Sequence, residues 1–321
     1  MPEVNDKKFP YTEKGKADAK KEAKKLLQNE GIQKVITTGP PHSTHLIGLE
    51  LKAAFGIQWW ADFRDPWTHI FYNKDLYRSI WAKKKDANWE QKVLQTADGI
   101  MTTVGGSLVQ KLQYKAPKQR FHVLPNGYDE ALMSSIPKTS REVFHVVFTG
   151  LLTENQDYLP VMEVLNKFAD QYDIQLSLAG NIADSSIDKI KITAPKIIIE
   201  NKGYLSHKEA IALMKSGDLL LNFIFKGADQ DMISGKLLEY LATGVPVLSI
   251  GDAQSEAGRF LATASFAKMI PAFKTSALKT FIDKAAQQKG KAKNDMPEIK
   301  KWSRENITAI LHDILETENT R

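Results

Sequence analysis

Apolar runs alternate with segments of helical spacing along almost the whole chain. The runs that we interpret as strands cover residues 35–39, 57–63, 99–104, 121–127, 143–150, 174–180, 196–203, 218–225 and 245–251. Because these runs are apolar without interruption, they are typical of parallel strands that are covered on both faces. Segments between them show helical spacing, for example at 157–172, 206–217 and 274–289. The pattern therefore predicts repeated strand–helix units.

Repeated strand–helix units favour doubly wound α/β sheets, in which ligands bind at the carboxyl ends of the strands. A polar segment at 128–142, which contains Pro137, separates two series of such units. The length of 321 residues suits two domains of roughly 150 residues each. We therefore predict two Rossmann-like domains, residues 1–135 and residues 136–321.

Composition narrows the classes of function. The chain has no cysteine, which excludes disulfides, thiolate metal sites and a thiolate nucleophile. His42 and His45 form the one close histidine pair, and no third ligand lies near them in sequence, so we predict no metal site. No signal pattern opens the chain, and no apolar run approaches the ~20 residues of a membrane span. We expect a soluble, cytoplasmic protein.

The net charge of +6 comes largely from two lysine-rich stretches, 14–25 and 83–85. Such stretches are most simply solvated helix faces. The alternative is peripheral contact with an anionic membrane at its inner face, where each basic residue contributes about 1 kcal/mol. Nucleic acid is not expected as a partner, because the basic stretches lack the interleaved aromatic residues of a single-strand binder.

Residues 231–251 carry the most specific chemistry. Ser234 can cap a helix, Gly235 keeps the backbone bare, and Lys236 adds a cation where free N–H groups already attract an anion. Glu239, one turn further on, could accept both hydroxyls of a ribose. Asp231 precedes the helix and could reach polar groups beyond the phosphates. This order predicts a site for a nucleotide diphosphate that carries a sugar.

A simpler interpretation of the same residues is that Ser-Gly-Lys merely begins a helix and that Glu239 is solvated. The segment is not a P-loop, because the Gly-x4-Gly-Lys-Ser/Thr spacing is missing. The complete order of acid, small residues, lysine, glutamate, Gly-x-Pro and apolar strand favours the nucleotide-sugar site.

This order resembles the second lobe of the retaining glycosyltransferases of family 4, which have the two-lobed GT-B fold. In that family, a Glu, seven residues and a second Glu mark the donor site, and here Asp231 and Glu239 hold those places. The resemblance implies that Glu239 binds the donor ribose. It also implies that the backbone at 234–236 and the Lys236 side chain hold the diphosphate, and that Asp231 faces the transferred sugar.

Residues 37–67 resemble the first lobe of bacterial members of the same family, and Pro-Asn-Gly-Tyr-Asp at 125–129 resembles the junction that ends that lobe. His42 lies at the carboxyl end of one strand, and Arg64 and Asp65 leave the next strand at the same edge. The resemblance places Arg64 and Asp65 on the acceptor and sugar side of the site, and His42 is expected to point into the same crevice. The alternative interpretation is that His42 only caps a helix and that Arg64 and Asp65 form a local ion pair.

The sequence departs from the family in two places. Family members open with a strand and a glycine-rich loop, whereas the first residues here are charged, so we expect an incomplete first domain with four strands. After Gly150, which we place at the diphosphate, relatives carry an arginine and a lysine, but this chain has LLTENQDYLP. Lys236 and Lys226 are left to neutralise the phosphates, which predicts weak or altered donor binding.

The resemblance further implies that the main chain of Gly203, Tyr204 and Leu205 contacts the base. No cofactor is expected besides the nucleotide-sugar substrate. We predict retaining, metal-independent transfer of a sugar from a nucleotide-sugar donor to a carbohydrate or lipid-linked acceptor, in cell-envelope polysaccharide biosynthesis. The alternatives are a nucleotide-sugar epimerase on the same fold and a non-catalytic protein that binds nucleotide or a lipid surface.

Overall fold

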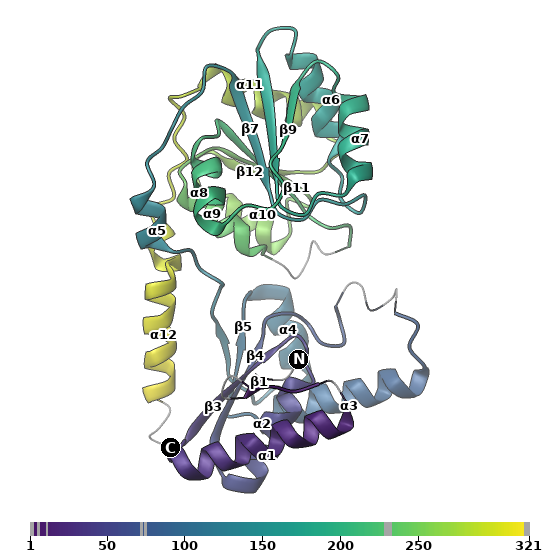
Figure 1. Ribbon diagram of the computed structural model, residues 1–321, viewed down its shortest axis with the longest axis vertical. Helices are drawn as coiled ribbons and strands as arrows, with labels where there is room; N and C mark the ends of the chain where they lie inside the picture. Colours follow the sequence, from purple (N-terminus) through teal and green to yellow (C-terminus); the bar gives the residue numbers. More distant parts are fainter. Residues whose placement is uncertain are drawn as a thin grey trace. The chain divides into compact units, whose positions relative to one another are not determined.

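The computed structural model describes residues 3–4, 7–10, 12–70, 73, 76–227 and 233–317. The chain forms two compact units, Met1–Leu124 and Pro125–Arg321, each built around its own parallel sheet (Figure 1). Two Rossmann-like α/β units are what the alternation of strands and helices predicts, and this fold class is confirmed.

The sheet of the first unit has four parallel strands in the order β3 (Lys34–Gly39), β4 (Gln58–Phe63), β5 (Gly99–Thr102) and β6 (Phe121–Val123). The helices of this unit are α1 (Glu13–Glu30), α2 (Thr44–Phe55), α3 (Ile80–Thr96) and α4 (Gly106–Lys115). A short antiparallel pair, β1 (Glu3–Val4) and β2 (Lys7–Lys8), precedes them. The four strands predicted for this half are all present.

Strand β4 supplies the core of the first unit with large rings. Trp59 and Trp60 are almost completely buried, one on each face of the strand. Two glycines make room for them: a Cβ on Gly48 of α2 would lie 2.0 Å from Trp59 Nε1, and a Cβ on Gly99 of β5 would lie 2.2 Å from the Trp60 ring. The paired tryptophans therefore require glycine on the elements that pack against them.

The second unit has six parallel strands in the order β12-β11-β10-β7-β8-β9. They are β7 (Phe144–Thr149), β8 (Ile174–Ala179), β9 (Ile198–Asn201), β10 (Leu219–Phe223), β11 (Val247–Ile250) and β12 (Ala267–Ile270). The chain starts in the middle at β7, builds outward to β9, returns to β10 and builds the other way. This is the order of a doubly wound sheet, and its halves diverge between β7 and β10.

Helices cover both faces of the second sheet. One apolar core lies under α6 (Leu159–Phe168), α7 (Asp184–Thr193) and α11 (Thr275–Gln287). The other lies under α8 (His207–Lys215), α9 (Gly235–Ala242) and α10 (Glu256–Leu261). The remaining elements are α5 (Glu130–Ser135), the 3-10 turn Ile299–Trp302 and α12 (Arg304–Thr317).

The second unit includes the polar segment 128–142. Tyr128, Met133 and Ile136 are buried in the core under α9, which explains why this unit begins at Pro125 and not at residue 136. Within the described ranges, no helix is both long enough and apolar enough to cross a membrane.

Candidate functional site

Helix α9 is fixed at the place where the halves of the second sheet diverge. The hydroxyl of Tyr240, on α9, accepts a hydrogen bond from Thr149 N at 2.8 Å and lies 3.4 Å from Thr149 O, which it can donate to. Tyr240 is fully buried, so this contact ties α9 firmly to the carboxyl end of β7. In doubly wound sheets, ligands bind at this end of the strands.

Lys236 lies one turn before Tyr240 and brings an ammonium group to the same strand end. Its Nζ donates to Thr149 O at 3.2 Å and lies 4.4 Å from the centre of the Phe148 ring. No carboxylate of the described residues forms an ion pair with it. Burial lowers the pKa of Lys236 to about 8. A desolvated cation without a nearby anion favours the binding of an external anion.

Glycines leave the backbone bare at the ends of neighbouring strands. Gly150 follows β7 with φ 121°, and Gly180 follows β8 with φ 116°. A Cβ on Gly150 would lie 3.1 Å from Lys236 Nζ, and a Cβ on Gly180 would lie only 2.3 Å from Gly150 O. Sequence reasoning selected Gly150 but missed Gly180, although the same signal, a strand that ends in glycine, was present for both.

The start of α9 differs in one detail from the sequence-based expectation. Ser234 occupies the N-cap position, but its side chain makes no capping hydrogen bond. The helix start is packed instead against Asn126, whose Nδ2 would lie 3.2 Å from a Cβ on Gly235. Asn126 belongs to the Pro-Asn-Gly segment that carried part of the family resemblance, but it was not predicted as a site residue.

The carboxylate of Glu239, in the middle of α9, is held by two basic side chains. Its Oε1 lies 2.8 Å from His207 Nε2 at the start of α8 and 3.6 Å from Arg304 Nη2 at the start of α12. Neither partner was expected from the sequence. Both contacts are to one oxygen, and among the described residues Oε2 has no ion-pair partner. Glu239 can therefore still offer an acceptor to a ribose hydroxyl.

The segment predicted to contact the base joins β9 to α8. Gly203 adopts φ 63°, and its carbonyl accepts from Gly180 N at 2.8 Å, which joins this segment to the glycine turn after β8. Tyr204 is 90% exposed, and Leu205 packs on the core under α9. Ser206 and Glu209 form a capping box that fixes the start of α8. The main chain of 203–205 is thus held in place while the Tyr204 ring projects into solvent.

The loop between β7 and α6 contains no arginine or lysine. Gln156 is buried and ties this loop to the end of β10, because its Nε2 donates to Phe223 O at 2.9 Å. Lys226, the second cation that we assigned to the phosphates, pairs with Asp157 at 3.0 Å. Lys236 is therefore the better placed of the two for an anion. Asp231 lies outside the described residues.

At the sheet edge of the first unit, His42 is enclosed by the turn after β4. Its Nε2 lies 2.9 Å from Asp65 O, and its ring stacks on Trp67 at 5.4 Å. A carbonyl can only accept, so Nε2 carries the proton. Burial lowers the pKa of His42, although the bond to Asp65 opposes this shift. Nδ1 of a neutral His42 can then accept a hydrogen bond.

The acids of this edge are partly desolvated. Burial raises the pKa of Asp65 against the attraction of His42 and Arg64, and it raises the pKa of Asp62, on β4, to about 6. Arg64 is exposed, and its main chain is fixed, because Arg64 N donates to Gly39 O and Arg64 O accepts from Thr103. The structure therefore brings His42, Arg64 and Asp65 together, and it adds Asp62, which the sequence did not reveal.

His45 does not join His42 as a ligand pair. It is completely buried, its Nδ1 lies 2.9 Å from Thr37 Oγ1, and its ring stacks on Phe63 at 4.7 Å. Burial lowers its pKa to about 3, so it is neutral in the core. In the part of the chain that the structure describes, no three acidic or histidine side chains are grouped as metal ligands.

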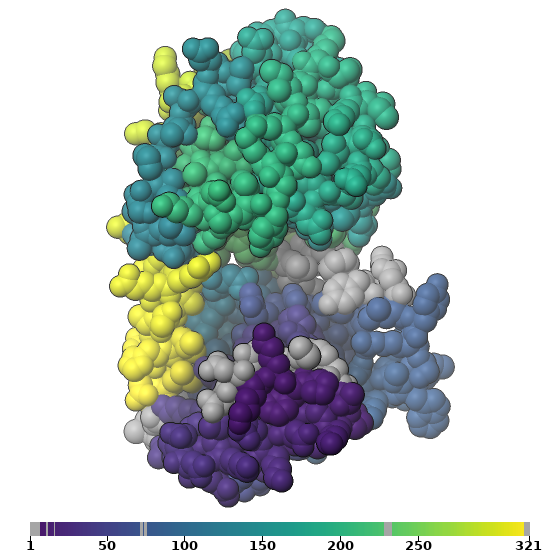
Figure 2. Space-filling model, in the orientation of Figure 1, coloured from purple at the N-terminus to yellow at the C-terminus, as the bar shows by residue number. Residues whose placement is uncertain are grey.

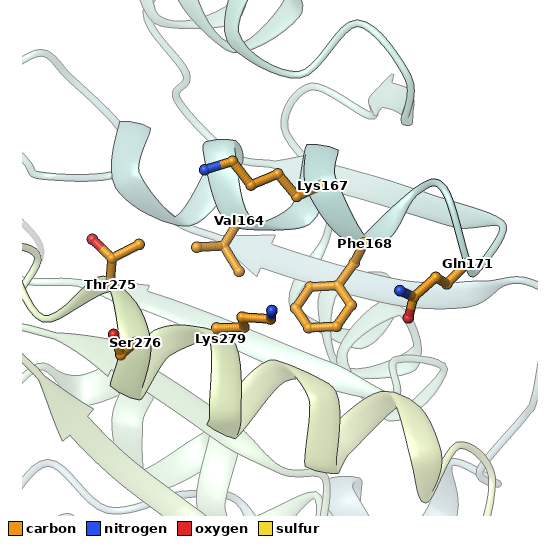
Figure 3. A pocket seen from close by; sticks show the side chains of 7 residues that line it. All are labelled: Val164, Lys167, Phe168, Gln171, Thr275, Ser276 and Lys279. Carbon is orange, nitrogen blue, oxygen red and sulfur yellow. The ribbon is translucent and has the colours of Figure 1, made fainter.

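A separate pocket lies between α6 and α11, on the face of the second sheet opposite α9 (Figure 3). Val164 and Phe168 form its apolar floor, and Lys167 and Lys279 stand at its rim. Both lysines are exposed to solvent, unlike Lys236. This pocket is therefore distinct from the site at α9.

No family model matches the chain, and no curated protein matches it. Solved structures do match it. Sucrose-phosphate synthase from Thermosynechococcus elongatus aligns with a TM-score of 0.68 and 12% identity, over 98% of this chain and 81% of that chain. Anabaena HepE in complex with UDP aligns with a TM-score of 0.65 and 12% identity, over 92% of this chain and 81% of that chain. A "putative UDP-N-acetylglucosamine 2-epimerase" from Listeria monocytogenes aligns with a TM-score of 0.63 and 14% identity, over 99% of this chain and 83% of that chain.

At these identities, the similarity shows the fold alone. The chain has the fold of GT-B glycosyltransferases, as the motifs at 37–67 and 231–246 led us to expect. Membership of family 4 and the roles of the individual site residues stay predictions.

Proposed function

We propose that this chain binds a nucleotide sugar at the start of α9 and transfers the sugar to a carbohydrate or lipid-linked acceptor. The observation that carries this proposal is the Lys236 ammonium. It lies at the carboxyl end of β7, beside bare glycine backbone, without an acidic partner among the described residues. A diphosphate offers the negative charge that this position lacks.

In the proposed reaction, the acceptor hydroxyl oxygen attacks the anomeric carbon of the sugar while the bond from that carbon to the diphosphate breaks. The hydroxyl proton passes to the departing phosphate oxygen. Lys236 and the N–H groups at the start of α9 stabilise the charge that develops on this leaving group. Attack and departure on the same face give retention at the anomeric carbon, and no step needs a metal ion.

Other residues position the two substrates. Glu239 accepts from the ribose, and the main chain of 203–205 contacts the base. Asp231 orients hydroxyls of the transferred sugar. In the first unit, neutral His42 and the carboxylate of Asp65 accept from acceptor hydroxyls, and Arg64 supplies a donor at the same edge.

A nucleotide-sugar epimerase is the second candidate, because the Listeria protein described as a putative epimerase shares the fold. The two activities differ in their products. An epimerase converts its nucleotide sugar without an acceptor, whereas a transferase releases nucleoside diphosphate in proportion to a glycosylated acceptor.

Calorimetric titration with uridine, guanosine, adenosine and thymidine diphosphates tests the binding step. We expect one diphosphate to bind and the corresponding monophosphate to bind more weakly, because Lys236 needs the second phosphate. The nucleotide sugar of that base is then incubated with and without acceptors, and the products are separated by mass and anomeric configuration. If none of the diphosphates binds, the proposal fails.

A further inference from the structure

Four large apolar side chains are exposed together at the start of α3. Tyr77 is 109% exposed, Trp81 84% and Ile80 73%, and Leu76 lies next to them at 41%. We call these four residues the apolar tip. Elsewhere in the described ranges, exposed large apolar residues are more widely spaced along the chain. A single exposed apolar residue is normal, whereas a contiguous group marks an interaction surface.

The next turn of the same helix is strongly basic. Lys83, Lys84 and Lys85 are exposed, and in the described part of the chain none of them forms an ion pair. Helical spacing puts Lys84 and Lys85 beside the Trp81 side chain. Asp86, the first acid after the tip in the sequence, forms an ion pair with Arg78. Apolar rings and uncompensated positive charge therefore share one surface.

Within the described residues, the buried side chains of α3 all lie in its second half. Val93 and Leu94 are completely buried, and the buried carboxylate of Glu90 binds Lys115 and Thr68. The first turns of α3 extend beyond the sheet of their own unit (Figures 1 and 2). Ser79 still caps the helix by accepting from Ala82 N at 3.2 Å. Ile80 and Trp81 thus lie on the first turn of a capped helix, Leu76 and Tyr77 directly precede it, and all four side chains are exposed.

We propose that the apolar tip and Lys83–Lys85 dock the protein onto an anionic lipid bilayer. Tryptophan and tyrosine are enriched at membrane interfaces, and lysines on the same surface add electrostatic attraction to anionic headgroups. Protein interfaces are also rich in these aromatic residues but are depleted in lysine. The lysine content of this surface therefore favours the bilayer over a protein partner.

This proposal goes beyond nucleotide-sugar transfer and rests on a different unit of the chain. Failure of nucleotide binding would leave the docking proposal standing, since the two use separate measurements.

Cosedimentation of the full chain with vesicles tests the docking. Binding is expected to vesicles that contain phosphatidylglycerol, to be much weaker to phosphatidylcholine alone, and to fall as salt is raised. The triple variant Tyr77→Ser, Ile80→Ser, Trp81→Ser should bind at least about tenfold more weakly. Lys83→Glu, Lys84→Glu, Lys85→Glu should weaken binding more, because each lysine near the surface contributes about fivefold.

Two matched variants separate docking from general charge attraction. Lys21→Glu, Lys24→Glu, Lys25→Glu makes the same charge change on α1 and should keep most of the binding. Tyr114→Ser removes an aromatic side chain of the same unit that is 88% exposed, and it should have no effect. Equal loss of binding in the two lysine variants would overturn the proposal.

Fluorescence locates the inserted residue directly. Brominated lipids should quench part of the tryptophan emission, and Trp81→Phe should remove this quenching while vesicle binding is kept. Circular dichroism of every variant confirms that it is folded. The proposal is wrong if the wild-type chain ignores anionic vesicles, or if the apolar tip instead mediates self-association that the triple serine variant abolishes in sedimentation velocity.

Discussion

The carboxyl edges of the two sheets are built from the same strand–helix turns but carry opposite chemistry. In the second unit, the edge presents Lys236 and the bare backbone of Gly150 and Gly180. In the first unit, it presents Asp62 and Asp65 beside the stacked rings of His42 and Trp67. One edge suits an anion, and the other suits hydroxyl groups. The fold supplies the location, and a few side chains decide which kind of ligand each location favours.

Among the changes considered, replacing Lys236 by methionine should have the largest effect, because it removes the cation that distinguishes the second edge from the first. The side chain keeps its length and apolar contacts but loses the charge, so nucleoside diphosphate affinity is expected to fall about 100-fold, since hydrogen bonds to charged groups contribute about 1.5–3 kcal/mol. Calorimetry measures the change. Lys279→Met, at the rim of the pocket between α6 and α11, is the control and should bind as the wild type does. Unchanged affinity in Lys236→Met would remove the anion site from α9.

Gly180→Ala should damage the second edge through its backbone. With φ 116° and a Cβ 2.3 Å from Gly150 O, the alanine cannot fit without moving the turn. We expect a loss of about 2 kcal/mol in the free energy of unfolding, measured by urea denaturation. Gly290→Ala, at φ 70° with no atom within 4 Å of its Cβ, should lose less. Equal losses would mean that the crowding against Gly150 is relieved at little cost.

The pH dependence of diphosphate binding tests whether Lys236 is the cation that holds the diphosphate. Lys236 has a pKa of about 8 in the free protein, and a bound anion favours the protonated form. From pH 7 to pH 9, where the phosphates are already ionised, affinity should fall about tenfold, with proton uptake on binding near pH 9. Calorimetry in buffers of different ionisation enthalpy measures this uptake. Affinity that is constant over the range would argue for a cation that does not titrate there.

Asp62→Asn gives the smallest expected effect and tests the first edge. Burial raises the pKa of Asp62 from 3.8 to about 6, so the folded protein binds the proton more tightly and loses stability as pH rises between these values. At pH 7, the asparagine variant should therefore be more stable, because it has no buried charge. We expect a gain of only about 1 kcal/mol in the free energy of unfolding, since solvent screens part of the effect of burial. Near pH 4, the difference should vanish.

Urea denaturation at both pH values measures this effect. A variant that is less stable than the wild type at pH 7 would show that Arg64 and Thr38 hold Asp62 in its ionised form. The first edge would then carry a charged acid instead of one that is poised between its two states.

The sequence predicted the fold well because strands buried on both faces leave continuous apolar runs. All the strands expected between 35 and 251 are present. The short edge strand β12 was missed: it is only four residues long, it contains the exposed Lys268, and only its last two residues, Met269 and Ile270, are buried. The order of the six strands in the second sheet could not be seen in the sequence, since hydrophobic spacing carries no information about which strands are neighbours.

The site was predicted in part. The residues of 234–236 and Glu239 were selected because they are close in sequence, and their roles stay predictions. Asn126, Gly180, Tyr240 and the partners of Glu239 come from distant segments and were missed or not expected, since their roles depend on contacts that only the folded sheet creates. Ser234 shows the reverse case: the residue type predicts a cap, but its side chain makes no capping bond.

The carbonyl of Thr149 receives two donors from one helix, the ammonium of Lys236 and the hydroxyl of Tyr240. If a phosphate draws the ammonium away, as the proposed binding requires, the hydroxyl of Tyr240 remains to satisfy that carbonyl. The ammonium could then leave without an unsatisfied, desolvated carbonyl behind it, and the end of β7 would keep this hydrogen bond with or without a ligand.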